Sequence, residues 1–241
     1  MDNREYWPPA TIAKFLEKLA FRKRKECSFD TLKGKQVILI PGMGAPVSQL
    51  FELVNALRSD DSFQEYGITA IELGLSLGDF SFTLETLIHK VEEELLSRAK
   101  VEQIVLFAHS HGGRFASELA TYLKKAHTNL DLVVITAGTP IEVRPQSLTN
   151  WLISLAFRQW PKVNQPQLDM FFALYSKTDK IVNTERATVG SNATLIELEM
   201  FDHDYFRIPA KIVPELKRLC NRFQHPPLVG VMYNPHHICQ I

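Results

Sequence analysis

The sequence predicts an α/β protein in which a mostly parallel central sheet is flanked by helices, and three observations support this prediction. Short apolar runs rich in β-branched residues alternate with longer segments whose apolar residues recur at the helical period. The runs are apolar at nearly every position, as expected of strands that are buried on both faces of a parallel sheet. With 241 residues, 45% of them hydrophobic, the chain suits one domain with a large core.

Six segments are predicted to be strands. In chain order they cover residues 36–40, 68–73, 103–109, 130–137, 170–175 and 193–200. Helices are expected around residues 50–57, over 82–99, from 112 to about 125, and over 209–223, because apolar side chains recur there on one face. Strands that alternate with helices in this way are typical of a parallel sheet covered by helices.

Three segments lie outside this alternation. Residues 1–34 hold a predicted amphipathic helix and a basic run at 22–25, and residues 224–241 form a C-terminal tail around the domain at 35–223. The N-terminal helix has two interpretations: it covers the sheet, or it makes a peripheral contact with an anionic membrane. The third segment, residues 141–167, is an insert between the fourth and fifth strands.

Charge and cysteine content limit which binding partners and which cellular compartment we expect. Acidic and basic residues number 27 each, which gives no reason to expect a nucleic-acid surface. The three cysteines are widely spaced and odd in number, which suits a reducing compartment. The first residues lack the apolar core of a signal peptide, and no run reaches the length of a membrane span. We therefore expect a cytoplasmic protein.

The segment Ala-His-Ser-His-Gly-Gly at residues 108–113 falls between a predicted strand and a predicted helix. A nucleophile that stands clear at the end of a strand needs a very sharp turn, which crowds the positions two before and two after it. Ala108 and Gly112 are small at those positions, and Gly113 lets the helix approach the sheet. The alternative is that Ser110 caps the N-terminus of the helix.

This segment resembles the nucleophile elbow of the α/β-hydrolase family, small-x-Ser-x-Gly, in a variant with alanine first. The resemblance implies that Ser110 is the nucleophile and that an acid and a histidine follow in that order. Residues 175–182, Tyr-Ser-Lys-Thr-Asp-Lys-Ile-Val, resemble the segment that carries the acid, which assigns Asp179. His203 follows the last predicted strand and takes the place of the base. One alternative is that Asp179 is a turn aspartate. Another is that Asp202 or Asp204, on either side of His203, binds the imidazole in place of Asp179 or caps the closing helix.

The same resemblance implies an oxyanion hole of two backbone amides, each worth about 3–4 kcal/mol in the transition state. One amide belongs to His111, the residue after Ser110. The other belongs to Met43, because Pro-Gly-Met-Gly at 41–44 is similar to the family's His-Gly-x-Gly, with proline in place of histidine. We predict no metal and no cofactor, and we interpret the short cluster of His236, His237 and Cys239 as no metal site.

The predicted function is hydrolysis of a small-molecule or lipid carboxylic ester by a metal-free serine hydrolase that resembles lipases and esterases. Residues 136–140, Thr-Ala-Gly-Thr-Pro, are similar to a segment of lipases and related deacylases. The insert at 141–167 contains an aromatic-rich helix that is either a lid over the acyl pocket or part of the core. Two alternatives remain open: a thioesterase or acyltransferase with the same chemistry, and a binding protein without enzymatic activity.

Overall fold

The computed structural model describes residues 33–42, 45, 47–71, 73, 80–140, 170–179, 182, 193–199 and 203–224, without the side chains of 47, 48 and 222–224. Most of three segments singled out by the sequence lies outside the described residues: residues 1–32 of the N-terminal stretch, the predicted lid at 141–167, and residues 225–241 of the C-terminal tail. The helices that the structure describes include none long and apolar enough to pass through a membrane.

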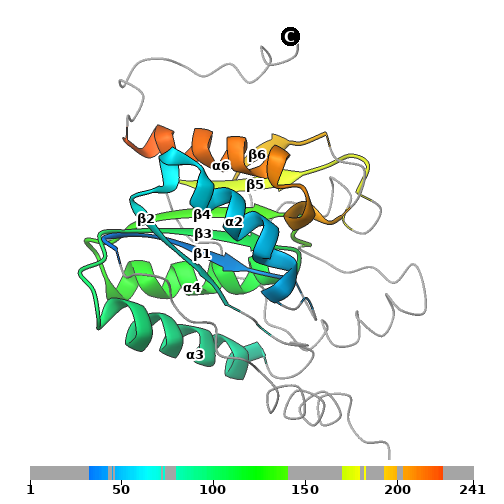
Figure 1. Cartoon of the computed structure of the whole chain (residues 1–241). Coiled ribbons are helices and arrows are strands. Elements are labelled where there is room, and N and C mark those ends of the chain that lie inside the picture. Colours follow the sequence, from blue (N-terminus) through cyan, green and yellow to red (C-terminus); the bar gives the residue numbers. More distant parts are fainter. Residues whose placement is uncertain are drawn as a thin grey trace, which may run out of the picture.

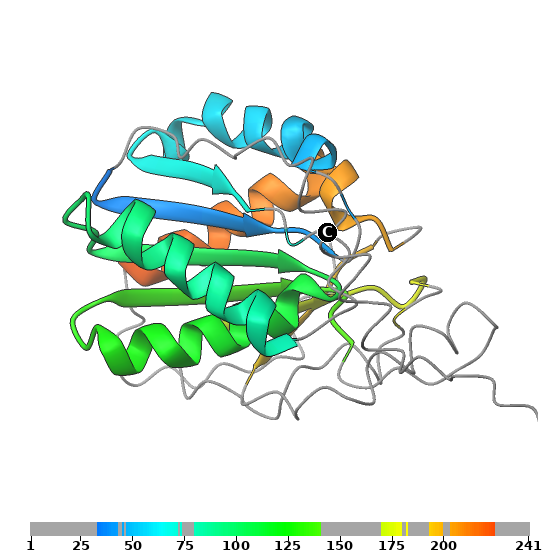
Figure 2. The ribbon, with the colours of Figure 1, turned by 90° about the horizontal axis from the view of Figure 1, so that it is seen from below.

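A six-stranded sheet with the order β2-β1-β3-β4-β5-β6 forms the centre of the molecule, and every neighbouring pair is parallel. The strands are β1 (Lys35–Ile40), β2 (Tyr66–Ala70), β3 (Gln103–His109), β4 (Asp131–Ala137), β5 (Phe171–Tyr175) and β6 (Thr194–Glu197). The arrows of β1 to β4 point the same way in Figure 2. All carboxyl ends therefore meet at one edge of the sheet, which is where open α/β sheets bind ligands.

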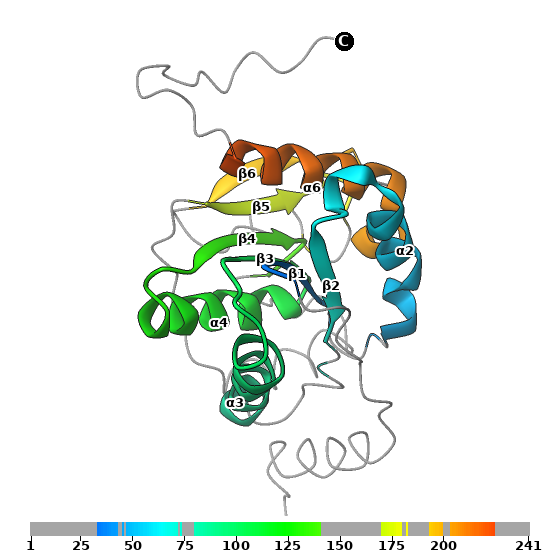
Figure 3. The same ribbon diagram turned by 60° about the vertical axis from the view of Figure 1, so that its left-hand side comes forward.

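Helices cover both faces of the sheet. In Figures 1 and 3, α2 and α6 lie on one face and α3 and α4 lie on the other. Their bounds are α2 (Phe51–Ser59), α3 (Phe80–Lys90), α4 (Gly112–Ala126) and α6 (Pro209–Gln224). The helix predicted over 82–99 changes type, because Val91–Leu96 is π-helical after α3. The prediction of a parallel sheet flanked by helices is confirmed.

The core is divided by the sheet into two apolar clusters, and β1 shows how one strand serves both. Val37 and Leu39 pack with α2 and α6, whereas Ile38 and Ile40 pack with α3 and α4. Successive side chains of a strand point to opposite faces, so a strand covered on both faces is apolar at every position. This explains why the central strands read as continuous apolar runs in the sequence.

The sixth strand departs from the prediction. It is shorter than the segment 193–200, and its side chains are mostly exposed, including Leu195 at 46%. Among the described residues β6 is the edge of the sheet and pairs only with β5. The expectation that all six apolar runs are buried on both faces is therefore wrong for this strand, because an apolar sequence run does not report how many neighbours a strand has.

Candidate active site

The turn between β3 and α4 presents Ser110 at the carboxyl edge of the sheet. Its φ of 51° is the only positive φ of a non-glycine residue in the part of the chain that the structure describes. An L-residue in this left-handed conformation is strained by about 1–2 kcal/mol. Two backbone hydrogen bonds hold the turn: the Ser110 amide donates to Ala137 (2.8 Å), and the Gly113 amide donates to Ser110 (3.1 Å).

The two glycines after Ser110 are required by the packing of this turn. A Cβ atom on Gly112 would lie 2.3 Å from the carbonyl oxygen of Pro41, and one on Gly113 would lie 2.0 Å from Oγ1 of Thr139. Both distances are far below van der Waals contact, so only glycine lets α4 begin this close to the ends of β1 and β4. The N-cap position of α4 belongs to His111, whose side chain makes no capping bond.

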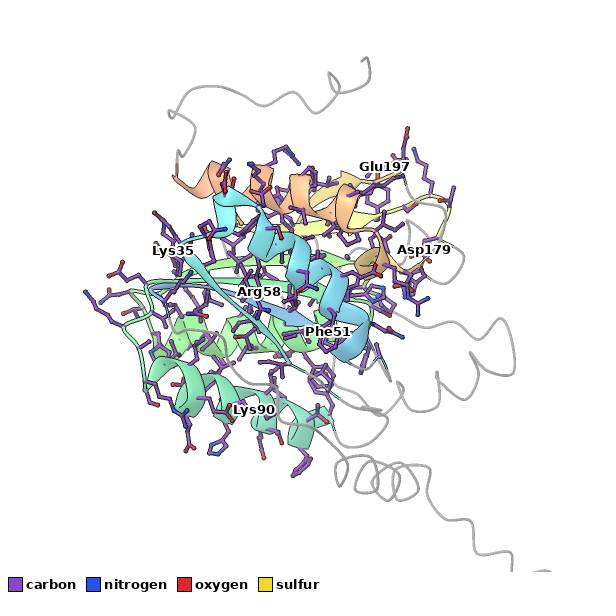
Figure 4. The ribbon with its side chains drawn as sticks, in the orientation of Figure 1. Lys35, Phe51, Arg58, Lys90, Asp179 and Glu197 are labelled. Atoms are coloured by element: carbon purple, nitrogen blue, oxygen red, sulfur yellow. The ribbon has the colours of Figure 1, made fainter. Side chains whose placement is uncertain are left out.

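A chain of two hydrogen bonds leads from the Ser110 hydroxyl to a buried carboxylate. Oγ of Ser110 lies 3.0 Å from Nε2 of His203, and Nδ1 of His203 lies 2.8 Å from Oδ2 of Asp179. The Asp179 side chain is fully buried, and that of His203 is 13% exposed. Figure 4 shows Asp179 at the opposite end of the sheet from Lys35, the first residue of β1. Three segments far apart in the sequence therefore meet at the carboxyl edge.

Further contacts fix the Asp179 carboxylate. The amide of Val182 donates to Oδ1 (2.8 Å), and the buried hydroxyl of Tyr205 donates to Oδ2 (3.4 Å). Burial, followed by the nearby Asp179 charge, raises the pKa of Tyr205, so its hydroxyl keeps its proton and remains a donor. A carboxylate with three hydrogen-bonding partners, His203 among them, is held in one orientation toward the imidazole.

Solved structures similar to the chain were found, whereas no protein-family model and no curated protein sequence matches it. RedJ, with polyethylene glycol in its active site, has a TM-score of 0.57 at 17% identity, covering 89% of this chain and 98% of RedJ. An α/β hydrolase from a sediment metagenome of the Mar Chica lagoon has 0.56 at 15% identity (83% and 98%). A lipase-esterase related protein from Clostridium acetobutylicum has 0.57 at 12% identity (78% and 95%).

The chain has the α/β-hydrolase fold. This confirms the family resemblance of the sequence at the level of the fold. At identities of 17% or less, the comparison concerns the arrangement of the strands and helices alone. The roles of individual residues in this α/β-hydrolase fold depend on their geometry.

The structure brings together Ser110, Asp179 and His203, the three residues that the sequence singled out. Of the two carboxylates considered as alternatives to Asp179, it describes only Asp204. Asp204 forms an ion pair with Arg207 (2.8 Å) and does not bind the imidazole. Asp202 lies outside the described residues, as does Met43. Gly42, the neighbour of Met43 in the sequence, is close to Ser110: a Cβ on Gly42 would lie 3.1 Å from Cβ of Ser110. The turn after β1 therefore reaches the site in this α/β-hydrolase fold.

The two histidines beside Ser110 are both buried. Burial, and then Arg114, lowers the pKa of His111. Burial is also the main cause that lowers the pKa of His109 to about 3, with His203 second. Both imidazoles are therefore neutral near pH 7. Within the described parts of the chain, no group of three His, Cys, Asp or Glu side chains is arranged to hold a metal ion.

Sequence reasoning missed three residues that surround the imidazole of His203. His109 directly precedes Ser110, and its Nε2 lies 2.7 Å from the carbonyl oxygen of His203. Gly138 has a φ of 54°, and a Cβ there would lie 3.2 Å from Cε1 of His203. Tyr205 donates to Asp179. The glycine directly after a buried strand was the one available signal for Gly138.

Proposed function

We propose that the protein is a serine hydrolase that cleaves carboxylic esters through an acyl intermediate on Ser110. The observation that carries the proposal is the hydrogen-bonded chain from the strained Ser110 through His203 to the buried Asp179. A serine hydroxyl becomes nucleophilic when a base accepts its proton, and the base needs a third group to orient it. We assign Ser110 as the nucleophile, His203 as the base and Asp179 as the group that orients the base.

The reaction proceeds in two halves. Nε2 of His203 accepts the proton of Ser110 while Oγ attacks the ester carbonyl and forms a tetrahedral intermediate. The intermediate collapses to an acyl-serine, and the imidazolium of His203 returns the proton to the leaving alcohol. Water then attacks the acyl-serine with His203 again as the base, which releases the acid and restores the Ser110 hydroxyl.

Asp179 holds the imidazole and balances the charge that it acquires. Its Oδ2 accepts from Nδ1–H of His203, which leaves Nε2 without a proton and directed at Ser110. The carboxylate lies in a site from which water is excluded, so it stabilises the imidazolium more strongly than it would in water. We assign the oxyanion hole to the backbone amides of His111, which follows Ser110 in the sequence, and Met43, which follows Gly42.

A thioester is the second candidate substrate. RedJ from Streptomyces coelicolor, described as a thioesterase of prodiginine biosynthesis, is similar to this chain with a TM-score of 0.53 at 13% identity. The same acyl-serine chemistry serves both substrates, which differ in the leaving group: an alcohol or a thiol. For either one, the substrate is a small-molecule or lipid acyl compound.

The test is hydrolysis of matched p-nitrophenyl esters and acyl thioesters of increasing acyl length by wild-type protein and Ser110→Ala. We expect turnover by the wild type and loss of turnover in Ser110→Ala. The control Ser59→Ala removes an exposed hydroxyl on α2, which bonds only the carbonyl of Asn55 in its own helix, and should keep full activity. Folded wild-type protein that cleaves none of these substrates would contradict the enzymatic proposal and favour a binding protein. Product analysis with an added primary alcohol separates hydrolysis from acyl transfer.

A further inference from the structure

His109, the last residue of β3, is placed at the junction of three segments of the site. Its Nε2 lies 2.7 Å from the carbonyl oxygen of His203, and the two rings lie 4.7 Å apart between centroids. The opposite ring nitrogen, Nδ1, faces the turn after β1, 3.4 Å from where a Cβ of Gly42 would lie. His109 as a whole residue is 9% exposed. A buried polar ring therefore contacts the segment of the base and the turn beside the nucleophile.

The protonation state of His109 follows from its partner. A carbonyl oxygen only accepts hydrogen bonds, so the proton of the neutral ring lies on Nε2. Burial keeps the ring neutral, since it lowers the pKa of His109 to about 3. This neutrality matters because His203 becomes positively charged in the proposed reaction, and a second charge at a ring separation of 4.7 Å would oppose that step.

We propose that His109 is a positioning residue, whose Nε2–H bond to the carbonyl oxygen of His203 holds the base at its working distance from Ser110. The inference rests on the proposed function, because it assigns His203 the role of the base. His109 and Ser110 are adjacent in the chain, and each forms a hydrogen bond to the same residue: one to its backbone and one to its imidazole. The bond from His109 therefore connects the base to β3, the strand that precedes the nucleophile.

The hydrogen bond from His109 fixes the distance between His203 and Ser110, on which the proposed proton transfer depends. The carbonyl of His203 also accepts the amide of Tyr205 (3.1 Å), but that bond lies within the same local turn and does not connect the base to β3. The bond from His109 makes that connection. Misplacement of a reacting group by about 1 Å lowers rates up to about 100-fold. Loss of this bond should therefore lower the rate of the chemical step more than it weakens substrate binding.

Three substitutions separate positioning from simple packing. The side-chain amide nitrogen of glutamine reaches the place of Nε2, so His109→Gln keeps the donor, whereas His109→Phe keeps the ring and lacks a donor. His109→Asn keeps an amide that is too short to reach the carbonyl. We expect kcat for p-nitrophenyl ester hydrolysis to fall about 10–100-fold in His109→Phe and His109→Asn, with KM nearly unchanged, and to be largely rescued in His109→Gln.

The matched control is His127→Phe. It removes a histidine bond of the same length, 2.7 Å from Nε2 to Oε1 of Glu92. His127 follows the last residue of α4, about 22 Å along the helix from the turn of Ser110 by the rise of an α-helix. We expect a small loss of stability and an unchanged kcat. Folded His109→Phe with wild-type kcat would overturn the inference, as would equal kcat in the Gln and Asn variants if the Phe variant does not fold.

A spectroscopic measurement keeps this test separate from the proposed function. The proton shared by His203 Nδ1 and Asp179 gives a downfield resonance in the proton spectrum when the imidazole is held in place. We expect the resonance to persist in His109→Gln and to broaden or disappear in His109→Phe. An inactive wild type would contradict the proposed function while this resonance still tested the position of His203. An unchanged resonance in His109→Phe would count against the role of His109.

Discussion

Gly138 allows the most detailed prediction, because its substitution combines backbone strain with a clash inside the site. Its φ is 54°, and an L-residue in this conformation is strained by about 1–2 kcal/mol. The new Cβ of Gly138→Ala would lie 2.6 Å from Cε2 of Tyr205, and relief of an overpacked contact of this kind costs about 1–3 kcal/mol. We expect the free energy of unfolding to fall by about 2–5 kcal/mol in total.

The same substitution should impair catalysis. An ordinary contact begins near 3.4 Å, so Tyr205 must retreat by 0.8 Å (3.4 minus 2.6). Tyr205 donates to Asp179, and the new Cβ would also lie 3.2 Å from Oδ2 of Asp179 and from Cε1 of His203. If Asp179 and His203 act as proposed, a displacement of this size at their side chains should lower kcat/KM by up to about 100-fold.

Urea unfolding and ester hydrolysis of the same preparations measure the two effects. The control is Gly34→Ala, whose Cβ would meet no atom closer than the Lys100 carbonyl at 3.7 Å. We expect that variant to match the wild type in activity and to change in stability by less than about 1 kcal/mol. If Gly138→Ala matched Gly34→Ala in both measurements, the packing described around His203 would be wrong.

Three further predictions concern ionisable groups. Asp179→Asn should lower kcat about 10⁴-fold without unfolding the protein, because an amide favours the wrong imidazole tautomer; circular dichroism checks the fold, and a loss below tenfold contradicts the assigned acid. Burial lowers the pKa of His109 from 6.5 to about 3, so the unfolded chain takes up this proton first and stability falls as the pH falls from 6.5 towards 3. The slope, about 1.4 kcal/mol per pH unit from this group, should be absent in urea titrations of His109→Gln. Burial raises the pKa of Cys220 to about 12, so iodoacetamide at pH 8 should alkylate Cys220 only after unfolding, as peptide mass mapping would show.

Much of the fold could be predicted from the sequence because burial on both faces leaves a direct mark on composition. The segment predicted at 103–109 coincides with β3, whose residues are all buried. The prediction failed at β6, whose residues Thr-Leu-Ile-Glu are mostly exposed at the edge of the sheet, because neither composition nor periodicity reports whether a strand has a neighbour on both sides.

The candidate site was also predictable from the sequence only in part. Ser110 was predictable because the sharp turn demands small residues two positions away, and parallel strands bring Asp179 and His203 to the same edge. The contact of His109 was not predictable, because it is with the backbone of a residue 94 positions away and no side-chain pattern encodes such a bond. The lid predicted at 141–167 and the amide of Met43 stay predictions.

The mass of the protein after reaction with a fluorophosphonate shows directly whether Ser110 is the nucleophile. We expect one adduct on folded wild-type protein, mapped by peptide sequencing to Ser110, and no adduct on Ser110→Ala. In the proposed mechanism His203 activates the hydroxyl and Asp179 orients His203, so the adduct should form slowly in Asp179→Asn. Folded wild-type protein that acquires no adduct, or acquires it at another residue, would contradict the assignment of Ser110 as the nucleophile.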